Sequence, residues 1–175
     1  RSFGTSPDDV HRRVDLPDEI WERLRAERRG NGIVFMTMHF GNWDMGAAVL
    51  ALHGFPISAV ADQFPNERLN RLVVESRQHL GMNVIPAGRT GPGILRALRN
   101  NDVVALLVDI PQPRGGIEVE FFGETIAVPD GPARIALSAG ASVVVALLPR
   151  VDPWSDQIGA QVAAVPYMPT GDRDT

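Results

Sequence analysis

Hydrophobic positions fall along this chain in short, nearly continuous runs separated by segments of helical spacing. Runs of strand length occur at residues 32–38, 102–109 and 142–148, and their lack of polar positions is typical of strands covered on both faces. Residues 66–80 instead place apolar side chains on one helical stripe. Strands alternating with helices predict an α/β fold, a single domain with a largely parallel central sheet flanked by helices.

Residues that favour helix ends set the boundaries of these elements. Pro17 is expected at the first position of a helix that Gly30 closes, and Asn42 is expected to cap a helix at 43–53. Asn66 caps the helix at 66–80 in the same way. Further strands are predicted at 57–61 and 82–86, a glycine-rich loop at 88–93 and a helix near 92–100, whereas residues 1–15 are predicted to be irregular.

The last third of the chain has a different pattern. Residues 116–123 alternate between apolar and polar, and 124–131 follow after a tight turn, which predicts an antiparallel hairpin. Pro132 then begins a short helix that Gly140 ends. An edge strand is expected within 157–165, so the sheet as a whole is predicted to be mixed.

Composition narrows the function classes. The chain has 175 residues and a net charge of −4, which fits one globular domain and argues against a nucleic-acid partner. It contains no cysteine, so disulfides, thiolate metal sites and a cysteine nucleophile are excluded. No apolar run approaches the roughly 18 residues that a membrane-spanning helix needs.

The sequence HFGNWD at residues 39–44 is the main candidate for chemistry. His39 is predicted at the carboxyl end of a buried strand and Asp44 in the first turn of the next helix, at the sheet edge where α/β proteins bind ligands. The two side chains meet only if the chain turns between them, and Gly41 permits that turn. Asp44 could then accept the Nδ1 proton of His39 and leave Nε2 as a base. The spacing alone is weak evidence, and a strand-end histidine beside an acid that satisfies a helix N-terminus is an equal alternative.

Two segments together resemble a known family. HFGNWD fits the His-x4-Asp motif of the lysophospholipid acyltransferase superfamily, in wording closest to the bacterial branch of lipid A lauroyl/myristoyl and phosphatidylinositol mannoside acyltransferases. Residues 116–141, with EFFGETIAVPDGPARIALSAGA, resemble the second signature of that branch. The resemblance covers about residues 30–150. It implies that His39 is the general base, that Asp44 orients it, and that a hydroxyl attacks an acyl thioester.

The same resemblance implies the partners and the remaining site residues. The donor is expected to be acyl-CoA or acyl carrier protein, with no other cofactor and no metal. The acceptor is expected to be a membrane lipid or glycolipid, reached peripherally at the cytoplasmic face of the inner membrane. Asp109 is implied as a catalytic acid near the acceptor. The segment DIPQP, which begins at Asp109, departs from the family pattern. The alternative for Asp109 is pairing with Arg114. Arg77 matches by its place a family arginine that lines the site, and it could reach inward to a phosphate or only extend to solvent. Apart from the resemblance, Asn42 is a further candidate for substrate binding, as is Arg89 in the glycine-rich loop, which could hold an anion at a helix N-terminus or be a plain loop.

Flanking segments usual in the family are missing, which predicts that residues 1–175 form one catalytic domain cut from a longer chain. Lipid A precursor and mannosylated phosphatidylinositol are both open as acceptors, with a slight preference for the second because every basic residue is arginine, as in high-GC organisms.

Two functions of other classes stay open. The first is a metal-dependent hydrolase using His39, Asp44, His53 and Asp62. The second is a non-catalytic domain that binds lipid or an acyl carrier.

Overall fold

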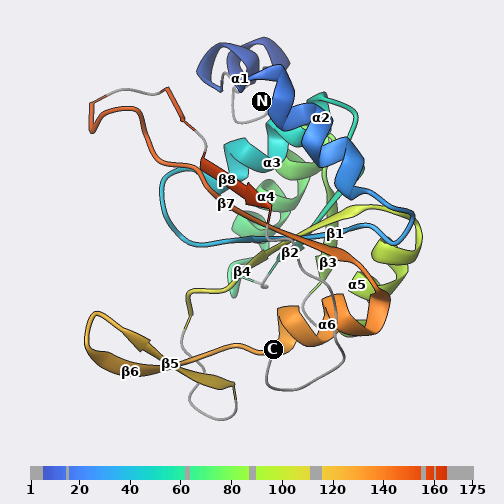
Figure 1. Ribbon diagram of the computed structural model, residues 1–175. Coiled ribbons are helices and arrows are strands. Elements are labelled where there is room, and N and C mark those ends of the chain that lie inside the picture. The colour runs from blue at the N-terminus through green and yellow to red at the C-terminus, as the bar shows by residue number, and fades with distance from the viewer. Residues whose placement is uncertain are drawn as a thin grey trace.

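A computed structural model gives the fold (Figure 1). It describes residues 6–14, 16–61, 64–86, 90–110, 116–154, 157–159 and 161–164. The helices are α1 (Pro7–Arg13), α2 (Asp18–Glu27), α3 (Trp43–Leu52), α4 (Glu67–His79), α5 (Thr90–Arg99) and α6 (Gly131–Ala139). The strands are β1 (Ile33–Thr37), β2 (Ile57–Ala61), β3 (Asn83–Pro86), β4 (Val103–Leu107), β5 (Ile117–Phe121), β6 (Glu124–Val128), β7 (Ser142–Leu147) and β8 (Gln161–Ala164).

The main sheet has six strands in the order β3-β2-β4-β1-β7-β8. All neighbouring pairs are parallel except β7 and β8, which pair antiparallel at one edge. The predicted α/β class with a mixed, largely parallel sheet is therefore confirmed. Strand β1 lies inside the sheet between β4 and β7, so its carboxyl end is surrounded by the ends of other parallel strands.

Helices cover both faces of the sheet, and two separate cores result. One core packs α1, α2 and α3 against side chains such as Ile33 and Phe35 of β1. The other packs α5 and α6 against the opposite face, where Val34 points. Alternate residues of one strand thus enter different cores, which explains why the run at 32–38 is apolar almost throughout.

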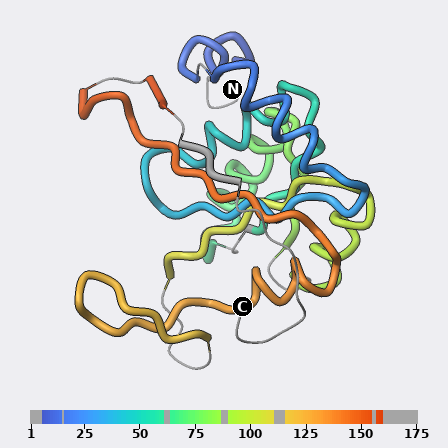
Figure 2. Tube along the Cα trace, viewed as in Figure 1, coloured from blue at the N-terminus to red at the C-terminus, as the bar shows by residue number. Residues whose placement is uncertain are grey.

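The predicted hairpin forms a small sheet of its own. Strands β5 and β6 pair antiparallel and belong to a two-stranded sheet apart from the main one. The hairpin extends away from the body on the side of the carboxyl ends of β1 and β4 (Figures 1 and 2). In the sequence, the hairpin lies between β4 and α6, so it follows the carboxyl end of β4.

Residues 1–15 are not irregular throughout, so that prediction is wrong. Residues 7–13 form helix α1, which Ser6 and Asp9 begin with a reciprocal capping box and in which Val10 is fully buried. A one-sided helix this short offers one buried apolar position, too few for a periodic signal. Smaller differences concern ends: α2 stops at Glu27, before Gly30, and α5 begins at Thr90, inside the segment predicted as loop.

Candidate functional site

The candidate site lies where β1 and β4 end side by side. These strands are parallel neighbours, and their register pairs Thr37 with Leu107. His39 and Asp109 each follow two residues later, so both leave the sheet at the same level. The carboxyl edge of a parallel sheet is where α/β proteins place their ligands, as the sequence predicted for His39.

Asp109 holds His39 through both carboxylate oxygens. Its Oδ1 lies 2.9 Å from His39 Nδ1, and its Oδ2 accepts a hydrogen bond of 2.8 Å from the His39 main-chain N–H. Burial by itself raises the pKa of the Asp109 carboxyl, but these hydrogen bonds outweigh it and lower the pKa below its ordinary value of 3.8. The carboxylate therefore stays ionised, fixes the ring by accepting at Nδ1, and leaves Nε2 available.

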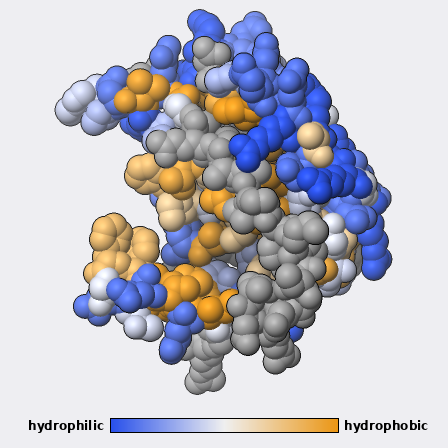
Figure 3. All heavy atoms as spheres, viewed as in Figure 1, coloured by the Kyte–Doolittle hydropathy of each residue, from blue (hydrophilic) through white to orange (hydrophobic). Residues whose placement is uncertain are grey.

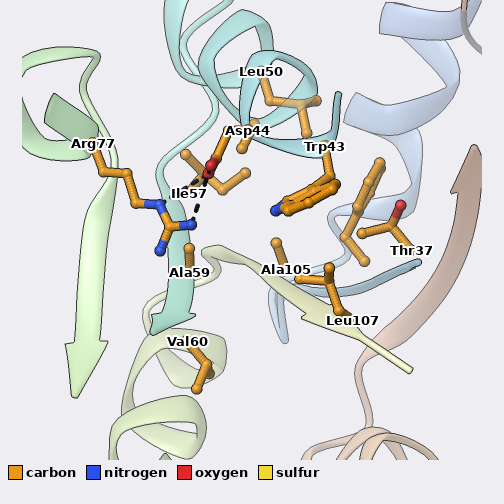
Figure 4. A pocket seen from close by; sticks show the side chains of 12 residues that line it. Thr37, Trp43, Asp44, Leu50, Ile57, Ala59, Val60, Arg77, Ala105 and Leu107 are labelled. Carbon is orange, nitrogen blue, oxygen red and sulfur yellow. Dashed lines mark hydrogen bonds and ion pairs between the residues drawn. The ribbon is translucent and has the colours of Figure 1, made fainter. Parts of the chain in front are cut away.

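Asp44 does not contact His39 in this way, and the predicted pairing of these two residues is wrong. Asp44 instead accepts from Arg77, with Oδ1 2.9 Å from Nε and Oδ2 3.2 Å from Nη2. The reason is the direction in which α3 leaves the turn. Asp44 stands on the side of α3 that faces Arg77 of α4 (Figure 4). His39 instead contacts Asp109, which follows β4.

Gly41 makes the turn between strand and helix, as predicted. Its φ is +71°, and an added Cβ would lie 1.7 Å from the main-chain oxygen of Leu148. The next residue, Asn42, donates its main-chain N–H to that same oxygen at 3.1 Å. The Asn42 side chain accepts from the N–H of Met45 at 3.1 Å, which confirms it as the cap of α3. The role of Asn42 in substrate binding stays a prediction, and its Oδ1 is already used in the cap.

Trp43 forms the wall between the histidine and the ion pair. Its ring meets that of His39 edge to face, with centroids 4.8 Å apart. Figure 4 shows the indole standing between Thr37 on one side and Asp44 with Arg77 on the other. Trp43 packs against the larger core, and it also lines the cavities of the site.

An open cleft of about 360 Å³ begins at His39. Its walls are largely apolar, with Phe64, Ile110, Val60 and the end of β4 around His39 and Arg77. The Arg77 side chain is only 16% exposed. It reaches inward as predicted, and two of its five N–H groups serve Asp44. Such a cleft suits an apolar chain that carries one anionic group.

Behind Trp43 lies a smaller pocket of about 20 Å³, room for about one water. It is lined mainly by apolar side chains of β1, α3 and β2 (Figure 4). On the side of the pocket formed by β1, Thr37 contributes a polar side chain. The residue is 5% exposed and its Oγ1 has no hydrogen-bond partner among the described residues. Sequence patterns indicated neither this hydroxyl nor the rim residues Phe64 and Ile110, because each is an ordinary strand or loop residue until the sheet is assembled.

Of the other candidate residues, the structure describes only His53, which lies apart from this group. Arg89 and Asp62 lie outside the described residues, as does Arg114, the alternative partner of Asp109. His53 stacks on Trp21 with centroids 3.8 Å apart, in contact with the core beneath α1 and α2. Within the described ranges no three histidine or acidic side chains are grouped to hold a metal ion, so the hydrolase alternative gains no support there.

In the part of the chain that the structure describes, each helix is too short or too polar to cross a bilayer.

Comparisons with known proteins agree on one family. The family model described as bacterial lipid A biosynthesis acyltransferase matches residues 4–174. A phosphatidylinositol mannoside acyltransferase of Mycolicibacterium smegmatis is 35% identical over 165 residues, which are 92% of this chain and 51% of the relative. A protein of the same name from Mycobacterium tuberculosis is 38% identical over 119 residues, 66% of this chain and 38% of the relative. The chain thus spans about half the length, or less, of these relatives.

Proposed function

The chain belongs to the bacterial lipid A biosynthesis acyltransferase family, and from that premise we propose that it transfers a fatty acyl chain from a thioester to a hydroxyl of a membrane glycolipid. The observation that carries the proposal is the two-point contact between His39 and Asp109 at the head of an apolar cleft. A fixed imidazole with one free nitrogen is what proton removal from a hydroxyl requires.

The reaction follows from that geometry in two steps. His39 Nε2 removes the proton of the acceptor hydroxyl as its oxygen bonds to the thioester carbonyl carbon, and a tetrahedral intermediate forms. The C–S bond then breaks, and the imidazolium returns the proton to the departing thiolate. Asp109 accepts the Nδ1 hydrogen throughout and stabilises the transient positive charge on the ring. The acyl thioester is the co-substrate, either acyl-CoA or acyl carrier protein, and the mechanism uses no further cofactor.

Arg77 and Asp44 have a separate part in this proposal. Asp44 fixes the guanidinium by a bidentate pair, and Arg77 also lines the cleft, where its remaining N–H groups suit a phosphate. In this proposal Asp44 positions an anion-binding arginine, whereas the resemblance implied that Asp44 orients His39. The names of the relatives favour a mannosylated phosphatidylinositol as acceptor, which carries such a phosphate. We also propose that the protein acts at the cytoplasmic face of the inner membrane.

A thioester-release assay tests the function directly. Wild-type protein is given acyl-CoA or acyl carrier protein donors, each with mannosylated phosphatidylinositol or with lipid A precursor, and free thiol is measured. We expect His39→Ala to lose about 10²–10⁴-fold in rate with the preferred pair of substrates. The matched control is His79→Ala, a histidine on α4 remote from the cleft lining. Equal rates for wild type and His39→Ala would refute the assignment of the base.

A further inference from the structure

The tip of the β5–β6 hairpin presents two phenylalanine rings to solvent. Phe121 is 53% exposed and Phe122 is 91% exposed. Their rings lie perpendicular to one another with centroids 4.7 Å apart. A pair of exposed aromatic side chains on a projecting element is typical of a contact surface.

The backbone of this turn makes Phe122 more unusual. Phe121 pairs with Glu124 across the hairpin, so Phe122 and Gly123 form a two-residue turn. Both have positive φ, +52° and +81°. Such turns strongly prefer Asn-Gly, because a bulky side chain at positive φ is strained. A ring that is nine-tenths exposed adds little to folding, so an aromatic residue at this position points to a role outside the folded core.

The hairpin also has one apolar face. Val119 and Phe121 alternate with Glu118 and Glu120, and Val119 pairs across the strands with Ile126. Alternate residues of a strand point to opposite faces, so the apolar residues lie together and both glutamates lie on the other face. The hairpin is thus amphipathic up to its tip, where Glu124 lies directly opposite Phe121 on the apolar face. The aromatic pair stands at that end.

A second group of exposed apolar residues lies at the cleft. Phe64 and Ile110, which line the cleft, are themselves about half exposed, and so is Phe40, the residue after His39. Figure 3 shows apolar atoms of the hairpin facing other apolar atoms of the same side across a hollow. The exposed aromatic residues and the entrance to the candidate site are therefore on one side of the molecule.

We propose that Phe121 and Phe122 insert into the interface of a lipid bilayer and so hold the mouth of the cleft against the membrane. This inference rests on the proposed function, because an acyl acceptor embedded in a membrane must enter from that side. Aromatic rings are well suited to the interface between headgroups and acyl chains. The hairpin thus binds the bilayer, and its binding turns the mouth of the cleft toward the membrane.

The charges of the hairpin determine which lipid surface fits. Glu118, Glu120 and Glu124 are all exposed around the aromatic pair, and they repel anionic headgroups. They likewise repel an acidic protein surface, such as an acyl carrier protein would offer. Insertion is therefore driven by apolar contact and needs no anionic lipid, in contrast to docking by basic patches.

Vesicle partitioning of the full chain tests the proposal. Phosphatidylcholine vesicles with and without phosphatidylglycerol are mixed with protein, and the bound fraction is measured by cosedimentation. We expect binding to pure phosphatidylcholine that changes little with salt, and a loss of about tenfold or more in Phe121→Ser/Phe122→Ser. Phe122→Asn is the sharper variant, because asparagine suits the turn: it should raise the melting temperature and still weaken binding. Leu69→Ser, an exposed apolar residue on α4, is the control expected to bind as wild type.

Turnover of a dispersed short-chain thioester separates this proposal from the proposed function. The Phe122→Asn variant should keep that turnover, and His39→Ala should keep vesicle binding. Wild-type binding by Phe122→Asn, or binding that requires phosphatidylglycerol, would overturn the docking surface and leave the chemistry untouched. Concentration-dependent dimers that Phe122→Asn abolishes, without vesicle binding, would identify a second copy as the occupant and also overturn it.

Discussion

His39 and Asp109 are 70 residues apart in sequence, and one carboxylate binds both the ring and the main-chain N–H of that histidine. The contact is a direct consequence of sheet register. Thr37 and Leu107 are paired on adjacent parallel strands, and each functional residue follows its strand by two positions. Because the main-chain bond fixes the position of the carboxylate, the ring is oriented by a rigid partner.

Removal of the Asp109 charge should affect the chemical step. In Asp109→Asn the amide no longer accepts at Nδ1 in the required way and does not stabilise the imidazolium, so we expect kcat to fall about 10²–10⁴-fold with little change in KM. Single-turnover thiol release measures it. The exposed acid Asp8 gives the matched control, and Asp8→Asn should keep the wild-type rate. A loss in KM alone would contradict the assigned role.

The Asp44–Arg77 pair should act on binding. Lysine cannot reproduce the bidentate contact, so Arg77→Lys is expected to raise KM about tenfold for a phosphate-bearing acceptor and to leave KM for a phosphate-free alcohol unchanged. Asp44→Asn should have the same signature, because it releases the guanidinium. The double variant should cost less than the sum of the two single variants, since the residues act as one unit. Additive effects in this cycle would argue against a shared role.

Gly41 should be intolerant of substitution. In Gly41→Ala the new Cβ would meet the carbonyl of Leu148, in a backbone conformation that already strains an L-residue, so we expect a loss of about 3 kcal/mol or more in the free energy of unfolding. Urea denaturation measures it. Gly91→Ala is the control, because Gly91 lies in α5 with no atom near its added Cβ, and it should be neutral or slightly stabilising. Equal effects at both glycines would refute the argument.

The substitution Thr37→Val should make the protein more stable. Its buried Oγ1 has no partner among the described residues, and removal of an unsatisfied buried hydroxyl by a residue of the same shape is favourable by about 1 kcal/mol. Thermal unfolding of Thr37→Val should show a higher midpoint than wild type. Ser58→Ala is the comparison, because the buried Ser58 hydroxyl favours the charged form of the Asp102 carboxyl and its removal should destabilise. A lower midpoint for Thr37→Val would mean that the hydroxyl is satisfied in solution.

Stability should fall in mild acid through His53. Burial lowers the pKa of His53 from its ordinary value of 6.5, and the nearby His11 and Arg25 add to this, while Asp18 opposes it. The His53 side chain of the unfolded chain therefore binds a proton more readily than that of the folded protein. The free energy of unfolding is thus highest above about pH 6.5, where both are neutral, and it decreases as the pH falls below 6.5. Melting temperatures at pH 7.5 and 5.5 give the slope. His53→Phe keeps the stack on Trp21 and should flatten that dependence; an unchanged slope would exclude His53 as its source.

Local interactions explain why so much of the fold was predictable. The two-sided apolar character of β1, the Asn42 cap and the Gly41 turn are decided within a few residues of one another, and the structure confirms all three. The hairpin at 116–131 was equally local, because alternation and a two-residue turn specify it. Helix α1 was missed since its stability comes from one buried valine, which only the rest of the core explains.

By itself, the sequence determined the order of strands and helices after residue 15, the glycine bend and the position of His39 just after a buried strand. Only the tertiary structure decided which acid meets the imidazole. Local sequence shows only which neighbours a turn could bring together, and the Gly41 turn made Asp44 a candidate. Strand order and register bring distant residues together, and they joined Asp109 to His39 and Asp44 to Arg77. Contacts across a parallel sheet depend on which strands become neighbours, and no short stretch of sequence carries that information.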